Sequence, residues 1–217
     1  MKVITPADTG KANPYENAGL QNMPDMLLRP GGLEMTKQLI WLAKLKPGAR
    51  ILDLGCGFGG SAAFLSNLGF NVVGIDKSRA LIKRGRELFP ELRLFEGNAE
   101  NIPLEGERFD AALLECSLSL MDVDSVLPEV SDILHPNGLL LISDVFYRTE
   151  EEYYRLLRPF GFEVTHFEDK TEFFGGFIAQ LIMSTGSLDT LFDCEQWEEI
   201  KKSKPRYCLA VARKRNG

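Results

Sequence analysis

Four glycines fall within six positions of the segment ILDLGCGFGG, which covers residues 51–60. Glycine loses more backbone entropy on folding than any other residue, so this density indicates a sharp turn or a ligand close to the backbone. Gly55, Gly57 and Gly60 match the G-x-G-x-x-G pattern of dinucleotide sites, whereas Gly55, Gly57 and Gly59 match G-x-G-x-G. The two patterns imply different cofactors and different chemistry.

Two aspartates near the glycines narrow the choice of cofactor. Asp76 ends the segment NVVGID and can accept hydrogen bonds from both hydroxyls of a ribose, which indicates an adenosine ligand. Asp53 lies two residues before the first glycine. Its charge would repel a pyrophosphate but stabilise an ammonium or a sulfonium, which favours S-adenosylmethionine over NAD. The other interpretation of Asp53 is that it accepts hydrogen bonds from the N–H groups of the local turn.

The position of these residues depends on the elements around them. Along the chain, short apolar segments that predict strands alternate with segments whose periodicity predicts helices. The predicted strands are residues 50–54, 71–76, 92–98, 109–115, 138–146, 162–169 and 206–214. The predicted helices are residues 33–46, 59–69, 78–89, 123–134 and 149–161. This alternation is typical of a parallel sheet covered by helices on both faces, which binds ligands beyond the carboxyl ends of its strands.

Composition excludes several classes of protein. The net charge of −6 argues against nucleic acid or an anionic membrane as partner. No apolar run approaches the ~18 residues that span a bilayer, and the first residues lack the apolar segment of a secretory signal. The four cysteines form no C-x-x-C pair, so we expect no disulfide framework, no metal site and a cytoplasmic location.

The 217 residues predict one domain with additions at two places. Residues 1–31 contain four prolines and are expected to form an irregular arm or lid before a single domain of residues 32–217. Residues 170–204 are expected to be an insertion on the substrate side that includes a helix with one apolar face. The residues of that face are Phe174, Phe177, Ile178, Leu181 and Ile182.

Four segments, in this order and at this spacing, resemble class I S-adenosylmethionine-dependent methyltransferases: LDLGCGFGG, GIDKS, GNAENIPLEGERFD and ILHPNGLLLISD. The resemblance is close over residues 49–146 and looser over the later strands. It implies a doubly wound, mostly parallel α/β sheet of seven strands in the order 3-2-1-4-5-7-6, with an antiparallel last strand. It also implies S-adenosylmethionine as cofactor and methyl transfer to a small-molecule acceptor.

The same resemblance implies roles for the residues around the glycines. The backbone of Gly55, Cys56 and Gly57 would hold the methionine end of the cofactor, with Asp53 beside it. Asp76 would accept hydrogen bonds from the ribose hydroxyls.

Further along the chain, the resemblance implies an adenine site and a reaction site. Lys77 would flank the adenine, and Asn98 and Ala99 would meet its edge. Glu115 and Cys116 would lie where cofactor and acceptor meet, and Glu115 is also counted among the cofactor-binding candidates.

Two residues of the arm, Tyr15 and Arg29, are candidates for the methionine carboxylate or the acceptor, because arginine binds carboxylates in a bidentate manner. The other interpretation of Arg29 is an exposed residue on a loosely ordered arm. His135 is expected at the end of the sheet opposite the ligand and His166 in the middle of a strand, so neither histidine predicts a general base.

Cys116 lies in the segment LLECSLSLMD, which resembles the stretch of arsenite methyltransferases in which a cysteine holds the metalloid. A thiolate is a soft ligand when its pKa is low. Cys56, Cys194 and Cys208 do not match the other cysteines of that family, so an inert, buried Cys116 is the other interpretation. An NAD-dependent oxidoreductase and a non-catalytic module that binds adenosylmethionine also remain as alternatives.

Overall fold

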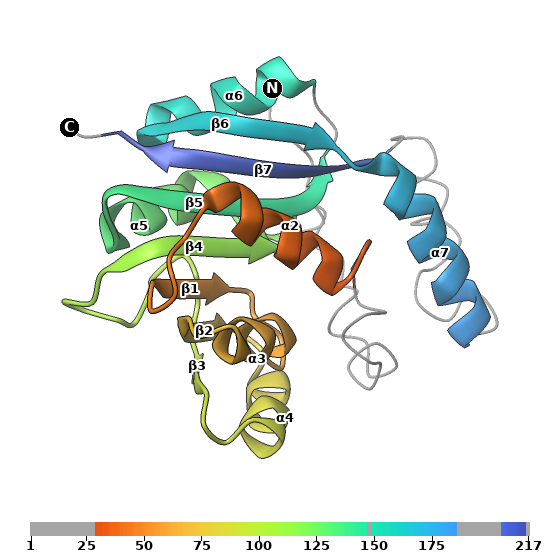
Figure 1. The fold of residues 1–217 in the computed structure, drawn as a ribbon, viewed down its shortest axis with the longest axis horizontal. Coiled ribbons are helices and arrows are strands. Elements are labelled where there is room, and N and C mark those ends of the chain that lie inside the picture. Colours follow the sequence, from red (N-terminus) through yellow and green to blue (C-terminus); the bar gives the residue numbers. More distant parts are fainter. Residues whose placement is uncertain (1–28, 147–148, 186–204, 216–217) are drawn as a thin grey trace.

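The computed structural model describes residues 29–146, 149–185 and 205–215 of the chain (Figure 1). These residues form a seven-stranded sheet in the order β3-β2-β1-β4-β5-β7-β6, which confirms the predicted topology. Neighbouring strands are parallel from β3 to β5 in this order, and β7 runs antiparallel to both β5 and β6. The strands are β1 (Arg50–Leu54), β2 (Asn71–Asp76), β3 (Arg93–Glu96), β4 (Phe109–Glu115), β5 (Leu134–Phe146), β6 (Phe162–Asp169) and β7 (Arg206–Lys214).

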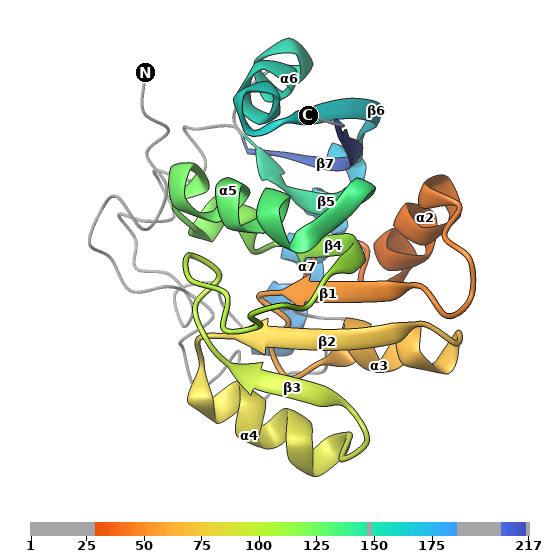
Figure 2. The same ribbon diagram turned by 90° about the vertical axis from the view of Figure 1, so that its left-hand side faces the viewer.

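Helices cover both faces of the sheet (Figure 2). On one face lie α2 (Leu33–Ala43), α3 (Gly60–Asn67) and α4 (Arg79–Leu88), and on the other lie α5 (Val123–Ile133) and α6 (Glu150–Leu157). Within the described ranges, the connections also include two short 3-10 helices, η4 (Leu118–Leu120) and η5 (Arg158–Phe160). None of the helices in the described ranges has the length and hydropathy needed to cross a bilayer.

The central strands are apolar on both sides because each side packs on helices. On β4, Ala111 and Leu113 join the core beneath α2 and α3, while Ala112 and Leu114 join the core beneath α5 and α6. All four side chains are buried. Polar residues on these strands are therefore confined to the strand ends, and the carboxyl ends carry the candidate site.

The fifth strand begins earlier than predicted, at Leu134 rather than residue 138. Leu134 pairs with Phe109, and the register then shifts between Phe109 and Ala111. Asn137 accommodates this irregularity with a φ of 63°, a left-handed conformation that asparagine tolerates better than most residues. The third strand is shorter than predicted and ends at Glu96.

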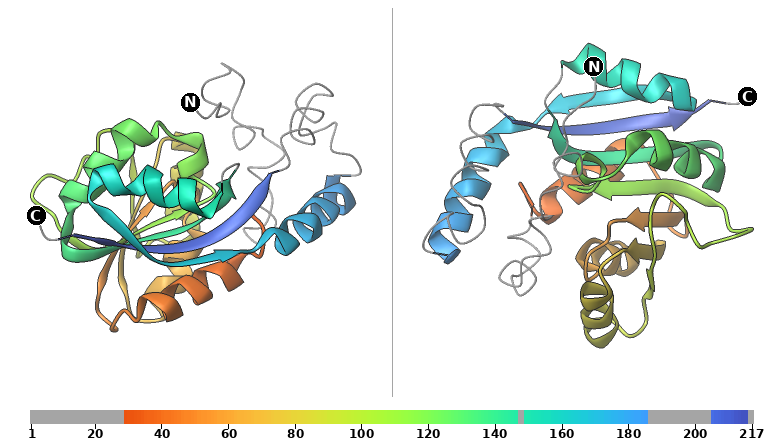
Figure 3. Two further views of the ribbon diagram at one scale, coloured as in Figure 1. Left: turned by 90° about the horizontal axis from the view of Figure 1, so that it is seen from above. Right: turned by 180° about the vertical axis from the view of Figure 1, so that it is seen from behind.

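A helix forms in the late segment, as the apolar periodicity predicts: α7 (Thr171–Thr185) follows β6 directly. The Oδ1 atom of Asp169 accepts a hydrogen bond from the backbone N–H of Thr171 at 2.9 Å, which fixes the start of the helix. Phe174 packs against the core beneath α2, whereas Ile182 and Met183 are exposed. The helix extends beyond the carboxyl ends of the parallel strands (Figures 1 and 3).

Candidate active site

The glycine turn between β1 and α3 is fastened to the end of β2. The backbone N–H groups of Gly55 and Cys56 donate to the carbonyl oxygen of Ile75 at 2.8 and 3.1 Å. The N–H of Gly57 donates to Oδ2 of Asp76 at 2.9 Å. A pyrophosphate needs free N–H donors, and these three are already engaged. The turn therefore suits a cationic group, which carbonyl oxygens can bind, better than a dinucleotide.

Two glycines of the turn are required for different reasons. Gly55 has a φ of 77°, and a Cβ atom there would lie 2.5 Å from the Cβ atom of Ser117. Gly57 has a φ of 58°, but a Cβ atom there would meet nothing within 4 Å. Gly55 thus allows close packing within the protein, whereas Gly57 lies on an open side of the turn, where a ligand can approach the backbone.

The carboxylate of Asp76 lies beside this open side. Its Oδ2 atom accepts the N–H of Gly57, and its Oδ1 atom accepts the N–H of Ser78 at 2.8 Å. Burial raises the pKa of Asp76 above its usual value, and the two backbone N–H groups oppose that rise. Each oxygen keeps a lone pair for a further donor, which is what the two hydroxyls of a ribose require.

Asp53 lies on β1 and is only 2 % exposed. Burial is the main cause that raises the pKa of the Cys56 thiol, and the negative charges of Asp53 and Asp76 add to the rise. Both carboxylates are therefore near Cys56 and flank the turn. The Cys56 side chain packs toward Gly74, where an added Cβ atom would lie 2.8 Å from its sulfur. Cys56 can therefore meet a ligand through its backbone alone.

The predicted adenine-side residues come together at the ends of β2 and β3. The N–H of Gly97 donates to the carbonyl oxygen of Asp76 at 3.0 Å, which joins the two strand ends. Lys77 and Asn98 are exposed, and Ala99 is buried. The Oδ1 atom of Asn98 accepts the N–H of Glu100 at 3.1 Å, so this side chain shapes its own turn.

Glu115, at the end of β4, is the centre of a buried hydrogen-bond network. Its carboxylate accepts hydrogen bonds from the hydroxyls of Thr36 at 2.9 and 3.1 Å, Ser61 at 2.5 Å and Ser143 at 3.3 Å. The Nη1 atom of Arg29 lies 3.5 Å from Oε2 of Glu115. The network thereby joins α2, α3, β4 and β5, and it includes Arg29 from the segment before α2.

These contacts settle where Arg29 lies. Arg29 is buried and its Nη2 atom lies 3.5 Å from the Thr36 hydroxyl, so the interpretation of Arg29 as an exposed residue is wrong. Glu115 and Arg29 are both at the carboxyl end of the sheet, as expected, but their charged groups contact each other. Tyr15 lies outside the described residues.

Cys116 follows Glu115 and has a φ of 50°, which is rare for a residue with a side chain. Its sulfur lies 3.7 Å from the hydroxyl of Tyr207, which also hydrogen-bonds to Ser143. Burial, and next the charge of Asp144, raise the pKa of the Cys116 thiol far above its usual value. The thiol is therefore protonated at neutral pH, and its nucleophilic thiolate form is disfavoured.

The described residues contain no group of three or more histidine, cysteine or acidic side chains that could hold a metal ion. Cys208 lies on the opposite face of β7 from Tyr207, the neighbour of Cys116. Cys194 lies outside the described residues. The described thiols therefore give no support to a metalloid site at Cys116.

Four hydroxyl residues of the site were missed from the sequence: Thr36, Ser61, Ser143 and Tyr207. Single hydroxyl residues carry no motif, and these come from four different elements. Ser143 gave the clearest signal, because together with Asp144 it interrupts the apolar run of β5 near the carboxyl end of the strand.

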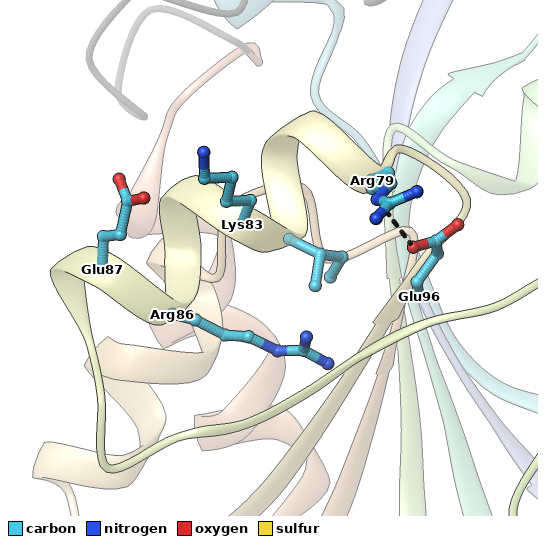
Figure 4. A pocket seen from close by; sticks show the side chains of 6 residues that line it. Arg79, Lys83, Arg86, Glu87 and Glu96 are labelled. Atoms are coloured by element: carbon cyan, nitrogen blue, oxygen red, sulfur yellow. Dashed lines mark ion pairs between the residues drawn. The ribbon is translucent and has the colours of Figure 1, made fainter.

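A cavity of about 390 Å³ lies elsewhere, between α4 and the sheet edge at β3 (Figure 4). Arg79, Lys83 and Arg86 line it, and Arg79 pairs with Glu96 across it at 4.0 Å. The guanidinium of Arg86 donates to the carbonyl oxygen of Leu94 at 2.6 and 3.0 Å. Arg86 thus satisfies a carbonyl of the edge strand, which protects that edge from pairing with another chain.

The Glu115 network predicts a large loss of stability when its charge is removed. Glu115→Gln removes the buried charge that Arg29 and the hydroxyls of Thr36 and Ser61 surround, so we expect the free energy of unfolding to fall by about 3 kcal/mol. Glu107→Gln is the matched control, because Glu107 pairs with Arg50 and Arg93 in a more exposed place. We expect the control to lose about 1 kcal/mol or less in urea unfolding. Equal losses would contradict the central position of Glu115.

Comparison with known proteins agrees with this geometry. A family model described as "Methyltransferase domain" matches residues 52–142. The chain is 30% identical over 161 residues to YodH, an uncharacterized methyltransferase of Bacillus subtilis (strain 168). The aligned residues cover 63% of this chain and 69% of YodH. It is 32% identical over 102 residues to the demethylmenaquinone methyltransferase of Beutenbergia cavernae, covering 46% of this chain but only 42% of that protein.

Among solved structures, the [4+2]-cyclase SpnF superposes with a TM-score of 0.68 over 85% of this chain and 81% of SpnF. At 23% identity this likeness shows the fold alone. The similarity to YodH and the matched methyltransferase domain identify the cofactor as S-adenosylmethionine rather than a nicotinamide dinucleotide. The chain belongs to the class I S-adenosylmethionine-dependent methyltransferases.

Proposed function

We propose that this methyltransferase binds S-adenosylmethionine across the carboxyl ends of β1, β2 and β3 and methylates a small, partly apolar molecule. When bound, the cofactor supplies an activated methyl group on its sulfonium. The single observation that carries the proposal is the contact between Gly57 and Asp76. A Cβ atom at Gly57 would meet nothing within 4 Å, and the N–H of Gly57 donates to Oδ2 of Asp76 at 2.9 Å.

The charges of the turn support this placement of the cofactor. Asp53 and Asp76 supply negative charge on either side of Gly55, Cys56 and Gly57, next to which a sulfonium and an ammonium are stabilised. The turn's engaged N–H groups leave carbonyl oxygens for the ammonium. We assign Asp76 to the ribose hydroxyls, and Lys77, Asn98 and Ala99 to the adenine side.

For the reaction step, we propose that the protein aligns the acceptor and excludes water. The Glu115 carboxylate already accepts protein hydrogen bonds, so we assign it to positioning α2 and α3 rather than to proton transfer. Burial raises the pKa values of the Cys116 thiol and the Tyr207 hydroxyl, so both stay protonated. Arg29 keeps its proposed place near the methionine carboxylate, held there by Glu115.

For the acceptor, we propose that α7 forms part of a cover on the substrate side. The cover predicted from the sequence also includes residues 1–28 and 186–204, which lie outside the described residues. The helix α7 supports this, because it extends past the carboxyl ends of the strands and exposes Ile182 and Met183. An apolar cover suits a partly apolar acceptor that is desolvated as it binds. The demethylmenaquinone methyltransferase similarity supports such a class. Cytoplasmic location and the absence of nucleic-acid and membrane partners remain predictions from composition.

Calorimetry tests the cofactor and separates the proposed enzyme from its alternatives. We expect S-adenosylhomocysteine and S-adenosylmethionine to bind and NAD not to bind, because the N–H groups of Gly55, Cys56 and Gly57 are already engaged within the protein. A panel of small apolar acceptors with methyl-labelled cofactor should then give turnover. Binding of NAD without response to adenosylhomocysteine would contradict the proposal. Intact binding with no turnover on a broad panel would favour a non-catalytic module.

Asp76 should account for a measurable share of the affinity. We expect Asp76→Ala to weaken adenosylhomocysteine binding by about 1.5–3 kcal/mol, because two charge-assisted hydrogen bonds to the ribose are lost. Asp76→Asn keeps one acceptor and should lose less. Isothermal titration of both variants measures the difference, and unchanged affinity in Asp76→Ala would mean that the ribose lies elsewhere.

Gly57→Val should abolish cofactor binding while the protein stays folded. The branched side chain would fill the open side of the turn, and at a φ of 58° it adds backbone strain. Gly106→Val is the matched control, since Gly106 has a φ of 76° and also faces open space, but lies in the turn before β4. We expect similar melting temperatures for the two variants and loss of adenosylhomocysteine affinity in Gly57→Val alone. Retained binding in Gly57→Val would count against this placement.

A further inference from the structure

The loop of residues 117–122, between β4 and α5, contacts the glycine turn. The Ser117 hydroxyl donates to the carbonyl oxygen of Leu54 at 2.8 Å. Ser117 and Met121 both pack on Gly55, where an added Cβ atom would lie 2.5 Å from the Cβ of Ser117 and 3.3 Å from the Cε of Met121. No space is left between the loop and the turn, so a displacement of the loop must displace Gly55.

The other end of the loop contacts the adenine-side turn. The N–H of Asp122 donates to Oε1 of Glu100 at 3.3 Å. Glu100 is held in turn by Asn98, whose Oδ1 accepts the N–H of Glu100 and whose Nδ2 donates to Oε2 of Glu100. The loop therefore bridges the two segments that we assign to opposite ends of the cofactor.

One buried carboxylate anchors this loop to the sheet. Asp144, near the end of β5, is 2 % exposed. Its Oδ2 atom accepts the N–H of Ser119 at 2.9 Å, and its Oδ1 atom accepts the Ser119 hydroxyl at 2.7 Å and the N–H of Val145 at 2.7 Å. The carboxylate thus holds the backbone and the side chain of the same loop residue.

We propose that Asp144 is a positioning residue for the cofactor: it fixes the loop of residues 117–122 against the glycine turn and the Asn98 turn. The inference rests on the proposed cofactor site. Asp144 acts through Ser119 and Ser117, and its removal should change affinity for the cofactor more than global stability.

If Asp144 positions the loop, cofactor affinity should depend on the ionisation of its carboxyl group and therefore on pH. Among the described residues, the titratable groups that interact with it are Cys116, which follows β4, Cys208 on β7 and Tyr153 on α6. Burial raises the pKa of each, so all three are neutral near pH 6. Burial also raises the pKa of Asp144 to about 6, against the opposing hydrogen bonds from Ser119. A proton on Oδ2 would replace the acceptor of the Ser119 N–H with a donor and loosen the loop.

The effect on global stability has the opposite sign. Because the pKa of folded Asp144 lies above that of an unfolded aspartate, the folded state binds more protons between about pH 4 and pH 6. This group therefore stabilises the fold more as the pH falls through that range. A loss of cofactor affinity near pH 5 cannot then be ascribed to Asp144-linked unfolding.

The test is adenosylhomocysteine affinity by calorimetry at pH 5, 6 and 7.5, with thermal unfolding at each pH. We expect wild-type affinity to fall about fivefold or more between pH 7.5 and pH 5. Asp144→Asn should bind about fivefold or more weakly at pH 7.5, with little further change at pH 5. Ser119→Ala should also bind more weakly. Asp110→Asn is the matched control, since Asp110 accepts the N–H of Arg50 at 2.8 Å at the amino end of the sheet, and its affinity should equal that of wild type.

An Asp144→Asn variant that keeps both the wild-type affinity and the wild-type pH profile would overturn the inference, and the profile would then belong to Asp76. If Asp144→Asn does not fold, Ser119→Ala decides, and unchanged affinity there overturns the inference equally. Wild-type protein that binds no adenosylhomocysteine at any pH would refute the proposed cofactor site instead.

Discussion

The buried carboxylate of Glu115 constrains how the rest of the molecule assembles. A charge removed from water is costly unless donors and a counter-charge surround it. The hydroxyls of Thr36, Ser61 and Ser143 and the guanidinium of Arg29 meet that need. Because these groups come from separate elements, satisfying one carboxylate holds α2 across the sheet, sets α3 beside the glycine turn and carries the residues before α2 to the carboxyl end.

Two further carboxylates, those of Asp76 and Asp144, hold backbone turns at the same edge of the sheet. Asp76 binds the N–H groups of Gly57 and Ser78 and so ties the glycine turn to β2. Asp144 binds Ser119 and ties the β4–α5 loop to β5. Each of these acidic residues lies at or near the carboxyl end of its strand, where a parallel sheet leaves its ligand site. Charged groups in this molecule therefore position backbone turns, while the apolar strands supply a rigid frame.

The sequence predicted the limits of β2 and β4 and the place of Asp53 and Asp76 at strand ends, because those features follow from local patterns. The strand order followed from the family resemblance and not from any local pattern. Glu115 was predicted at the right place but not with its partners. Thr36 lies 79 positions from it in the chain, and a single threonine in a helix has no local signature of such a contact. The early start of β5 was missed because the bulge depends on pairing with Phe109, which is a tertiary property.

A crystal structure with bound S-adenosylhomocysteine tests most directly whether the cofactor lies at the glycine turn and Asp76. We predict both ribose hydroxyls within hydrogen-bond distance of the Asp76 carboxylate and the methionine portion on the open side of Gly57. A ribose that makes no hydrogen bond to Asp76, or adenosylhomocysteine seated in the cavity between α4 and β3, would contradict it.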